Sequence, residues 1–248
     1  MALGPDKRFS LNTGSQAQRM TGAQAHAADI DIGLRTYMLK VYNYMCIGLA
    51  LTGAVAFATS TSPAMLQAIY GTPLKWVVML APLGFVFFLA ARVNSMKAST
   101  AQATFWVFAS IMGLSLAYIF IAYTGESVTR VFFITAGAFA GLSLYGYTTK
   151  KNLSGMGSFL IMGVIGLIIA SVVNIFLESS AMQFAISVLG VLIFAGLTAY
   201  DTQRIKTMYY ENDGTEAMEK KAIMGALTLY LDFINMFIFM LQLFGNRE

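Results

Sequence analysis

The chain has 248 residues, of which 57% are apolar and only 11% are charged, and its mean hydropathy is +0.66. A soluble domain of this length would need far more polar residues to cover its surface, so the composition excludes an ordinary soluble fold. The net charge is only +4, and no basic patch is interleaved with aromatic residues, which argues against nucleic acid as a partner.

The first 35 residues are rich in small and polar side chains, with a few scattered basic residues. We predict a flexible cytoplasmic tail over residues 1–35 and a transmembrane domain over residues 36–248. No apolar run of signal-peptide length precedes Ile30, so we expect the first membrane helix itself to direct insertion. With one cysteine (Cys46) and one histidine, the chain lacks the ligand cluster that a zinc site needs.

Seven apolar runs follow that are long enough to cross a hydrocarbon layer of about 30 Å. In lipid every backbone polar group must be satisfied within the segment, and the runs lack the alternation of a barrel strand, so they should be helices. We therefore predict an all-α integral membrane protein with seven transmembrane helices. The runs cover approximately residues 41–59, 74–91, 104–123, 131–147, 159–177, 184–200 and 222–244.

The basic residues between these runs predict the orientation. One side of the membrane would hold most of them, and the opposite side only Lys75, Arg130 and Arg247. We therefore expect a cytoplasmic N-terminus and an outward-facing C-terminus. A re-entrant last segment, which would return the C-terminus to the cytoplasm, remains an alternative because that segment carries an acid. The residues on the predicted cytoplasmic side are Lys7, Arg8, Arg19, Arg35, Lys40, Arg92, Lys97, Lys150, Lys151, Arg204, Lys206, Lys220 and Lys221.

Two acidic residues lie where a membrane helix normally has none. Asp232 falls in the middle of the last apolar run, where an ionised side chain costs about 2.5 to 3.5 kcal/mol. Asp201 closes the sixth run, which continues with helix-favouring residues to about Tyr210 before Asn212 and Gly214 supply a turn. The two helices are consecutive and antiparallel, and at a rise of about 1.5 Å per residue both acids lie roughly 15 to 20 Å from the turn. We therefore expect the two acids at similar depth.

Electrostatics limits what such a pair can do. Two carboxylates about 4 Å apart, at an effective dielectric constant of about 20, repel each other by roughly 4 kcal/mol. They would therefore either share a proton or bind a hard cation such as calcium through their oxygens. Proton and metal would compete for one site, which predicts a pathway that passes calcium and responds to pH near neutrality. The alternative is a hydrogen-bonded acid that only fixes the register of the helices.

The sequence around these acids resembles a known family. The segments GLTAYDTQ (196–203) and LSLYGYTTKKNLSGMG (142–157), with the Asp232 helix, are similar to the bacterial branch of the transmembrane Bax inhibitor motif family. The resemblance covers about residue 35 to the end, although the stretch between the two acids is longer here, by about residues 212–218. It implies seven helices with the last one central between two three-helix layers, and a pH-sensitive calcium leak controlled by an aspartate dyad that corresponds to Asp201 and Asp232. It also implies an arginine latch on the second helix, where Arg92 occupies a similar place, at a helix end where basic residues are expected anyway.

We therefore expect a passive conduit in the bacterial inner membrane, surrounded by the lipid bilayer, with calcium as the transported ion and no tightly bound cofactor. A second hypothesis is an inner-membrane interaction protein that modulates a membrane-anchored quality-control protease through its tail, as some relatives are thought to do. An enzyme is not expected, because no set of Ser, His and Asp and no metal-ligand cluster lies at membrane level.

Overall fold

A computed structural model describes residues 22–247 of the chain, with side chains from residue 32 onward. Seven helices in this part are long and apolar enough to cross a membrane, which confirms the predicted all-α membrane fold. Three short elements complete the described chain: α2 (Pro63–Tyr70), the 3-10 helix η1 (Val93–Ser95) and α5 (Ile119–Ala122). The long helices are α1 (Gly22–Ser60), α3 (Leu74–Arg92), α4 (Ala98–Leu116), α6 (Gly125–Thr148), α7 (Ser154–Leu177), α8 (Ser180–Thr207) and α9 (Thr215–Phe244).

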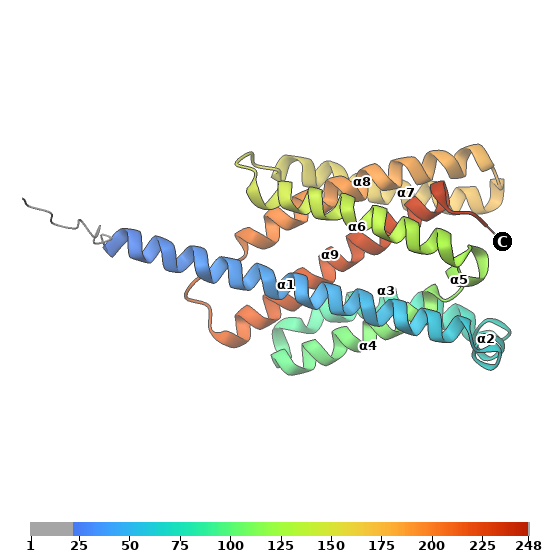
Figure 1. Cartoon of the computed structure of the whole chain (residues 1–248), viewed down its shortest axis with the longest axis horizontal. Helices are drawn as coiled ribbons and strands as arrows, with labels where there is room; N and C mark the ends of the chain where they lie inside the picture. The colour runs from blue at the N-terminus through green and yellow to red at the C-terminus, as the bar shows by residue number, and fades with distance from the viewer. Residues whose placement is uncertain (1–21, 248) are drawn as a thin grey trace, which may run out of the picture.

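The first helix starts earlier than the first apolar run. It begins at Gly22, so residues 22–35, which the sequence assigned to the tail, are helical. The alanines of this segment favour a helix, and Figure 1 shows α1 projecting beyond the other helices at one end of the bundle. Residues 1–21 lie outside the described part of the chain, so a flexible tail over them stays a prediction.

The seven long helices form two layers with α9 between them, as Figure 1 shows. One layer contains α1, α3 and α4, and the other contains α6, α7 and α8. Tyr230 of α9 is fully buried against the first layer, where its hydroxyl lies 2.6 Å from that of Thr52 and its ring 5.4 Å from that of Phe108. Phe233, nearly one turn further along α9, packs on Phe139 of α6 at 5.6 Å. The predicted central position of the last helix is therefore confirmed.

The last helix is continuous from Thr215 to Phe244. At about 1.5 Å per residue it is roughly 45 Å long, more than the hydrocarbon layer requires. The C-terminus lies at the end of the bundle opposite to the start of α1 (Figure 1). This geometry favours a complete crossing over the re-entrant alternative.

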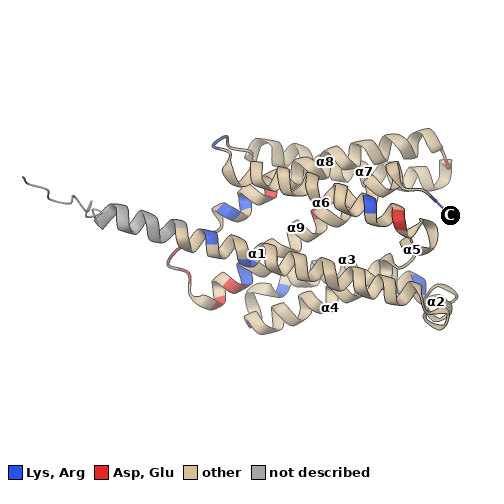
Figure 2. Ribbon diagram, in the orientation of Figure 1, with Lys and Arg blue, Asp and Glu red and all other residues tan. Residues whose placement is uncertain are grey.

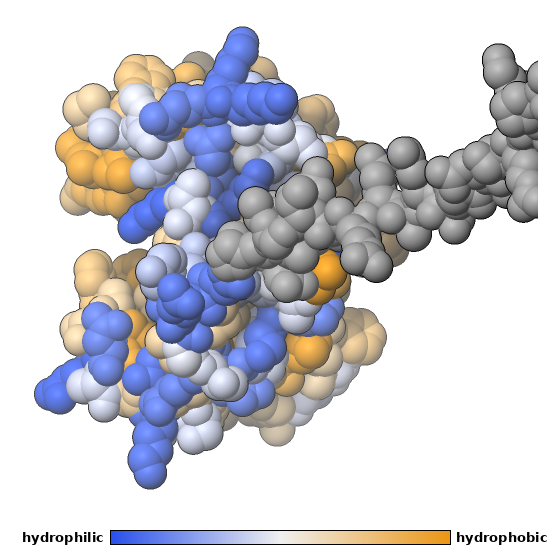
Figure 3. Space-filling view, turned by 90° about the vertical axis from the view of Figure 1, so that its left-hand side faces the viewer, coloured by the Kyte–Doolittle hydropathy of each residue, from blue (hydrophilic) through white to orange (hydrophobic). Residues whose placement is uncertain are grey.

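Charged and apolar side chains occupy different parts of the surface. Figure 2 shows most Lys and Arg residues at one end of the bundle, which we call the basic end; it contains the loop 149–153 and the loop 208–214. Figure 3, which looks onto this end, shows hydrophilic side chains across it and apolar side chains along its flanks. The outer helices α3 and α7 expose large apolar residues such as Phe87, Phe88, Ile175 and Phe176. Such a surface requires lipid around the bundle and water at its ends.

Candidate functional site

The structure brings Asp201 of α8 and Asp232 of α9 together. Their carboxyl groups lie close enough to interact electrostatically, and the two residues are only 6% and 4% exposed. The two helices are neighbours joined by the loop 208–214. Asp201 lies six residues before the end of α8 at Thr207, and Asp232 lies seventeen residues after the start of α9 at Thr215, so the similar distances from the turn that the sequence predicted are not found. The α8 helix continues past the sixth apolar run to Thr207, and this extension carries Asp201 within the helix rather than at its end.

One carboxylate oxygen of this pair has no partner. The Oδ2 atom of Asp232 is buried and accepts no hydrogen bond from any described residue. Glu219 of α9, which faces α1, differs, because it accepts hydrogen bonds from both Lys40 and Tyr44. Buried polar atoms in proteins normally have partners, and an exception often marks a functional group. Asp232 is such an exception in the core of the bundle.

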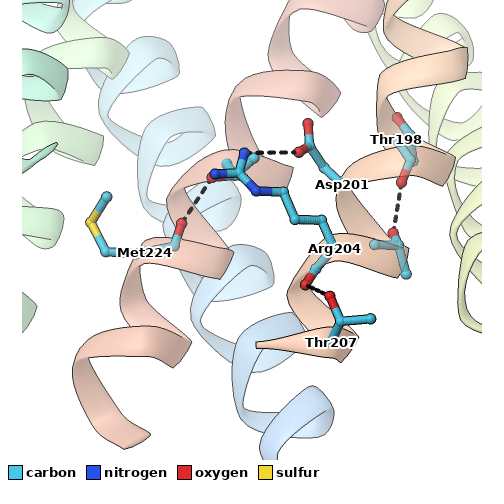
Figure 4. Close-up of polar contacts among 7 residues, drawn as sticks. Thr198, Asp201, Arg204, Thr207 and Met224 are labelled. Carbon is cyan, nitrogen blue, oxygen red and sulfur yellow. Dashed lines mark hydrogen bonds and ion pairs between the residues drawn. The ribbon is translucent and has the colours of Figure 1, made fainter. Parts of the chain in front are cut away.

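A positive charge lies beside the pair, and it belongs to Arg204. Its Nη1 atom is 3.8 Å from Oδ1 of Asp201, one turn earlier on α8, as Figure 4 shows. The Arg204 side chain is 60% exposed, so this contact joins the buried acids to the basic end. Arg92, the arginine that the resemblance suggested as a latch, ends α3 and forms no ion pair within residues 32–247. The latch role of Arg92 stays a prediction. In the structure the arginine that contacts Asp201 is Arg204.

The threonines around Asp201 do not bond to it. The hydroxyls of Thr198 and Thr202 instead donate to carbonyl oxygens one turn earlier on α8, at 2.8 and 2.7 Å. Thr202 also lies 3.0 Å from Ser143 of α6, whose hydroxyl is 2.6 Å from that of Tyr42 on α1. The polar contacts therefore leave the two carboxyl groups to each other and to Arg204.

Beyond the acids, the α8–α9 interface is closed by aromatic rings. Phe239 lies seven residues after Asp232, which is about 10 Å along the helix. Its ring stacks on Phe194 at 6.0 Å and fills the space over Gly190, where an added Cβ would lie 2.5 Å from the ring. Only glycine fits at position 190 without displacing this ring. The aromatic pair thus separates the acids from the end of the bundle opposite to the basic end.

That opposite end contains a polar pocket of about 500 Å³ between α5, α7, α8 and α9. The side-chain oxygen of Gln242 accepts hydrogen bonds from Gln183 at 3.0 Å and from Ser187 at 2.9 Å. Glu178 and Arg247 also line the pocket. Polar groups in this pocket can accommodate water or a hydrated ion, which the lipid-facing surfaces cannot.

The acid pair alone offers few ligands for a cation. No group of three or more His, Cys, Asp and Glu side chains that could hold a metal occurs among the described residues. Calcium takes six to eight oxygen ligands, and two carboxylates supply at most four. The remaining ligands would have to be water or backbone carbonyls.

Six membrane-spanning helices surround a seventh, α9, and a pair of acids is buried between α8 and α9. These features define the class: an integral membrane protein with an ionisable site inside the bundle. Residues 34–248 match the family described as "Inhibitor of apoptosis-promoting Bax1", and the chain belongs to this family. It is 53% identical over 230 residues to an uncharacterised protein of Caulobacter vibrioides, covering 88% of this chain and 92% of that protein. It is 48% identical over 218 residues to protein RP147 of Rickettsia prowazekii, with the same coverage of each chain. It is also 44% identical over 219 residues to the inner membrane protein YbhL of Escherichia coli, covering 87% and 94%.

Sequence reasoning missed two features of this region. Arg204 could have been found, because it stands three residues after Asp201 and side chains at that spacing meet on a helix. The fit of Phe239 on Gly190 could not, because it depends on the register between α8 and α9.

Proposed function

We propose that this protein is a pH-sensitive calcium leak channel in which Asp201 and Asp232 control permeation. The observation that supports the proposal is the meeting of two buried carboxyl groups, one of which keeps an unpartnered oxygen. Two such groups about 4 Å apart would repel each other by roughly 4 kcal/mol at an effective dielectric constant of about 20. They must therefore share a proton or attract a cation.

The proton and the calcium ion would compete for the same oxygens. With one proton between the carboxyls, the pair carries a single negative charge, which Arg204 at 3.8 Å stabilises. With both carboxyls ionised, the pair becomes a doubly negative site for a divalent cation. A change of pH would then shift the population between a form that excludes calcium and a form that accepts it.

The described conformation corresponds to a closed state of this conduit. The rings of Phe194 and Phe239 fill the α8–α9 interface between the acids and the polar pocket. Permeation therefore requires movement of these rings or of the helices that carry them. Hydrophobic constrictions of this kind gate channels by excluding water.

The proposal includes the membrane in which the channel lies and its orientation there. We infer that it is a multi-pass protein of the bacterial inner membrane, by analogy with the name of YbhL. The excess of basic residues at the basic end favours a cytoplasmic position for that end and for the N-terminus. The conduit requires no covalent chemistry and no tightly bound cofactor.

Proteoliposomes loaded with a calcium-sensitive dye test the proposal. We expect calcium flux in the unmodified protein to change between about pH 6 and pH 8, and Asp201→Asn and Asp232→Asn each to remove most of that change, since one carboxyl alone cannot form the pair. Asp213→Asn serves as a control. Asp213 forms an ion pair with Lys221 at 2.5 Å, and it is not part of the acid pair. Flux that responds to pH equally in both acid variants and in the unmodified protein would remove the pair from the mechanism.

A second function is supported by the projection of α1 beyond the bundle at the basic end. We propose that this projecting helix, with the residues that precede it, contacts a membrane-anchored quality-control protease. Deletion of residues 1–24 should then abolish co-purification of the protease and leave calcium flux intact. Loss of flux with retained co-purification would contradict this assignment.

A further inference from the structure

A pocket of about 370 Å³ lies at the basic end between the loop 149–153 and the last turns of α8. Four basic residues line it, namely Lys150, Lys151, Arg204 and Lys206, and none of its lining residues is acidic. We call it the basic pocket. Figure 2 shows its two sources of charge, the α6–α7 loop and the end of α8, on the same side of the bundle.

The basic pocket is held in shape by Gln203 of α8. The Gln203 side chain donates to the carbonyl of Lys151 at 2.8 Å and accepts from the backbone N–H of Leu153 at 2.8 Å. Next to this clamp Gly157 lies so close to Tyr200 that an added Cβ would be 2.3 Å from the ring. The loop is therefore fixed against α8, and the walls of the pocket exist before any ligand binds.

Three of the four basic residues of the pocket form no ion pair with a described residue, and the fourth, Arg204, lies 3.8 Å from Asp201. Lys150 and Lys151 form no ion pair within the part of the chain that has described side chains. Lys206 donates to the carbonyl of Tyr147 at 2.8 Å, which orients it without cancelling its charge. The α7 helix begins at Ser154 on the pocket wall, so the positive end of its dipole adds to the same field.

We propose that the basic pocket binds a phosphate group. Ammonium and guanidinium donors around a fixed cavity, with a helix N-terminus in its wall, are the chemistry that recognises phosphate oxygens. The phosphate could come from the headgroup of an anionic phospholipid or from a soluble ion, because the pocket lies where the apolar surface of the bundle ends. Lysines that served membrane topology alone would need charge and no fixed geometry, so the Gln203 clamp favours a binding site.

Occupation of the basic pocket would reach the acid pair through Arg204. The same guanidinium lines the pocket and lies 3.8 Å from Asp201. A bound phosphate would compete with Asp201 for it and so weaken the stabilisation of negative charge on the pair. This consequence rests on the proposed function, whereas the binding site itself does not.

Binding is measured on the purified full-length protein in detergent, at constant ionic strength, without any flux. The probes are dioleoylphosphatidylglycerol, dioleoylphosphatidylcholine and inorganic phosphate, followed by native mass spectrometry for the lipids and calorimetry for the ion. We expect Lys150→Gln and Lys151→Gln each to weaken binding of the anionic probe about fivefold, the ratio that corresponds to about 1 kcal/mol per basic residue. Lys97→Gln, which removes a lysine between η1 and α4 that does not line the pocket, should leave binding unchanged.

A further variant distinguishes a pocket of fixed shape from nonspecific electrostatic attraction of anions to the basic end. Gln203→Leu removes the clamp and no charge, so we expect it to weaken binding as well. Binding of phosphatidylglycerol alone would identify a lipid headgroup as the ligand, and binding of inorganic phosphate with the same dependence on Lys150 and Lys151 would identify a soluble one. The proposal is overturned if no anionic probe binds, if Lys97→Gln weakens binding as much as the pocket variants do, or if phosphatidylcholine binds equally in all of them.

Discussion

Removal of the charge on Arg204 should move the pH response of the channel in a defined direction. The guanidinium lies 3.8 Å from Asp201 and is 60% exposed, so water screens the contact. Coulomb's law at a dielectric constant of about 80 then gives about 1 kcal/mol for this distance. The positive charge favours the ionised pair, and without it the pair holds its proton to higher pH.

The variant Arg204→Gln should therefore raise the midpoint of the pH response by about 0.8 pH units or somewhat less, since one unit corresponds to about 1.36 kcal/mol. Proteoliposome flux measured in small pH steps gives the midpoint, whichever direction of pH opens the conduit. Arg204→Lys keeps the positive charge, so the midpoint of its pH response should stay close to that of the unmodified protein. The vesicles should contain only phosphatidylcholine, so that no anionic headgroup competes for the arginine.

Arg92→Gln tests which of the two arginines sets the midpoint of the pH response. Arg92 has no ion pair among residues 32–247, so its removal should leave the midpoint in place. A midpoint that moves in Arg92→Gln and not in Arg204→Gln would refute the electrostatic reasoning above and support the latch that the family resemblance suggests.

Two further predictions concern the helix contacts. Phe239→Ala should raise calcium flux at every pH while the pH dependence persists, because it removes the ring that fills the α8–α9 interface. Phe244→Ala, at an exposed position, should change flux little. Equal flux in both variants would contradict a gate at Phe239. Gly146→Ala should lower the thermal unfolding temperature in detergent, at a cost of about 1 to 3 kcal/mol, because its Cβ would lie 2.2 Å from the carbonyl oxygen of Ala199. Gly137→Ala, which meets no atom within 4 Å, should be neutral or slightly stabilising, and similar losses in both variants would show that the close approach of α6 and α8 is not what Gly146 provides.

The sequence predicted the membrane helices well because lipid imposes a strong constraint on them. Six of the apolar runs each lie within one long helix, whereas the run 104–123 is divided between α4 and α5. The other main difference is an extension into a polar segment, from Gly22 to Arg35 in α1. Hydropathy cannot place these ends, because a helix continues into water wherever its residues and neighbouring helices allow it. A count along regular helices predicted a similar level for Asp201 and Asp232, but α9 begins at Thr215, so Asp232 lies farther from the loop than Asp201 does. The packing of α8 on α9, which a count does not contain, is what brings the two acids together.

The partners of the acids were harder to predict than the acids themselves. The choice between Arg92 and Arg204 depends on how α3 and α8 sit relative to α9, and a count of residues contains no such information. The basic pocket is similar, because Gln203 meets the backbone of Lys151 across 52 positions of sequence. Contacts between distant segments are set by packing, and a single sequence shows the packing only through its small residues.

The central helix α9 makes different polar contacts with the two layers. Toward the layer of α1, α3 and α4, Tyr230 bonds to Thr52 and Glu219 bonds to Lys40. Toward the layer of α6, α7 and α8, Asp232 faces Asp201, and Gln242 near the far end of α9 bonds to Gln183 and Ser187. If the proposed channel is correct, a proton that enters or leaves this contact would change the packing between the two layers, so the step that admits an ion would also weaken the helix interface along which the ion must pass.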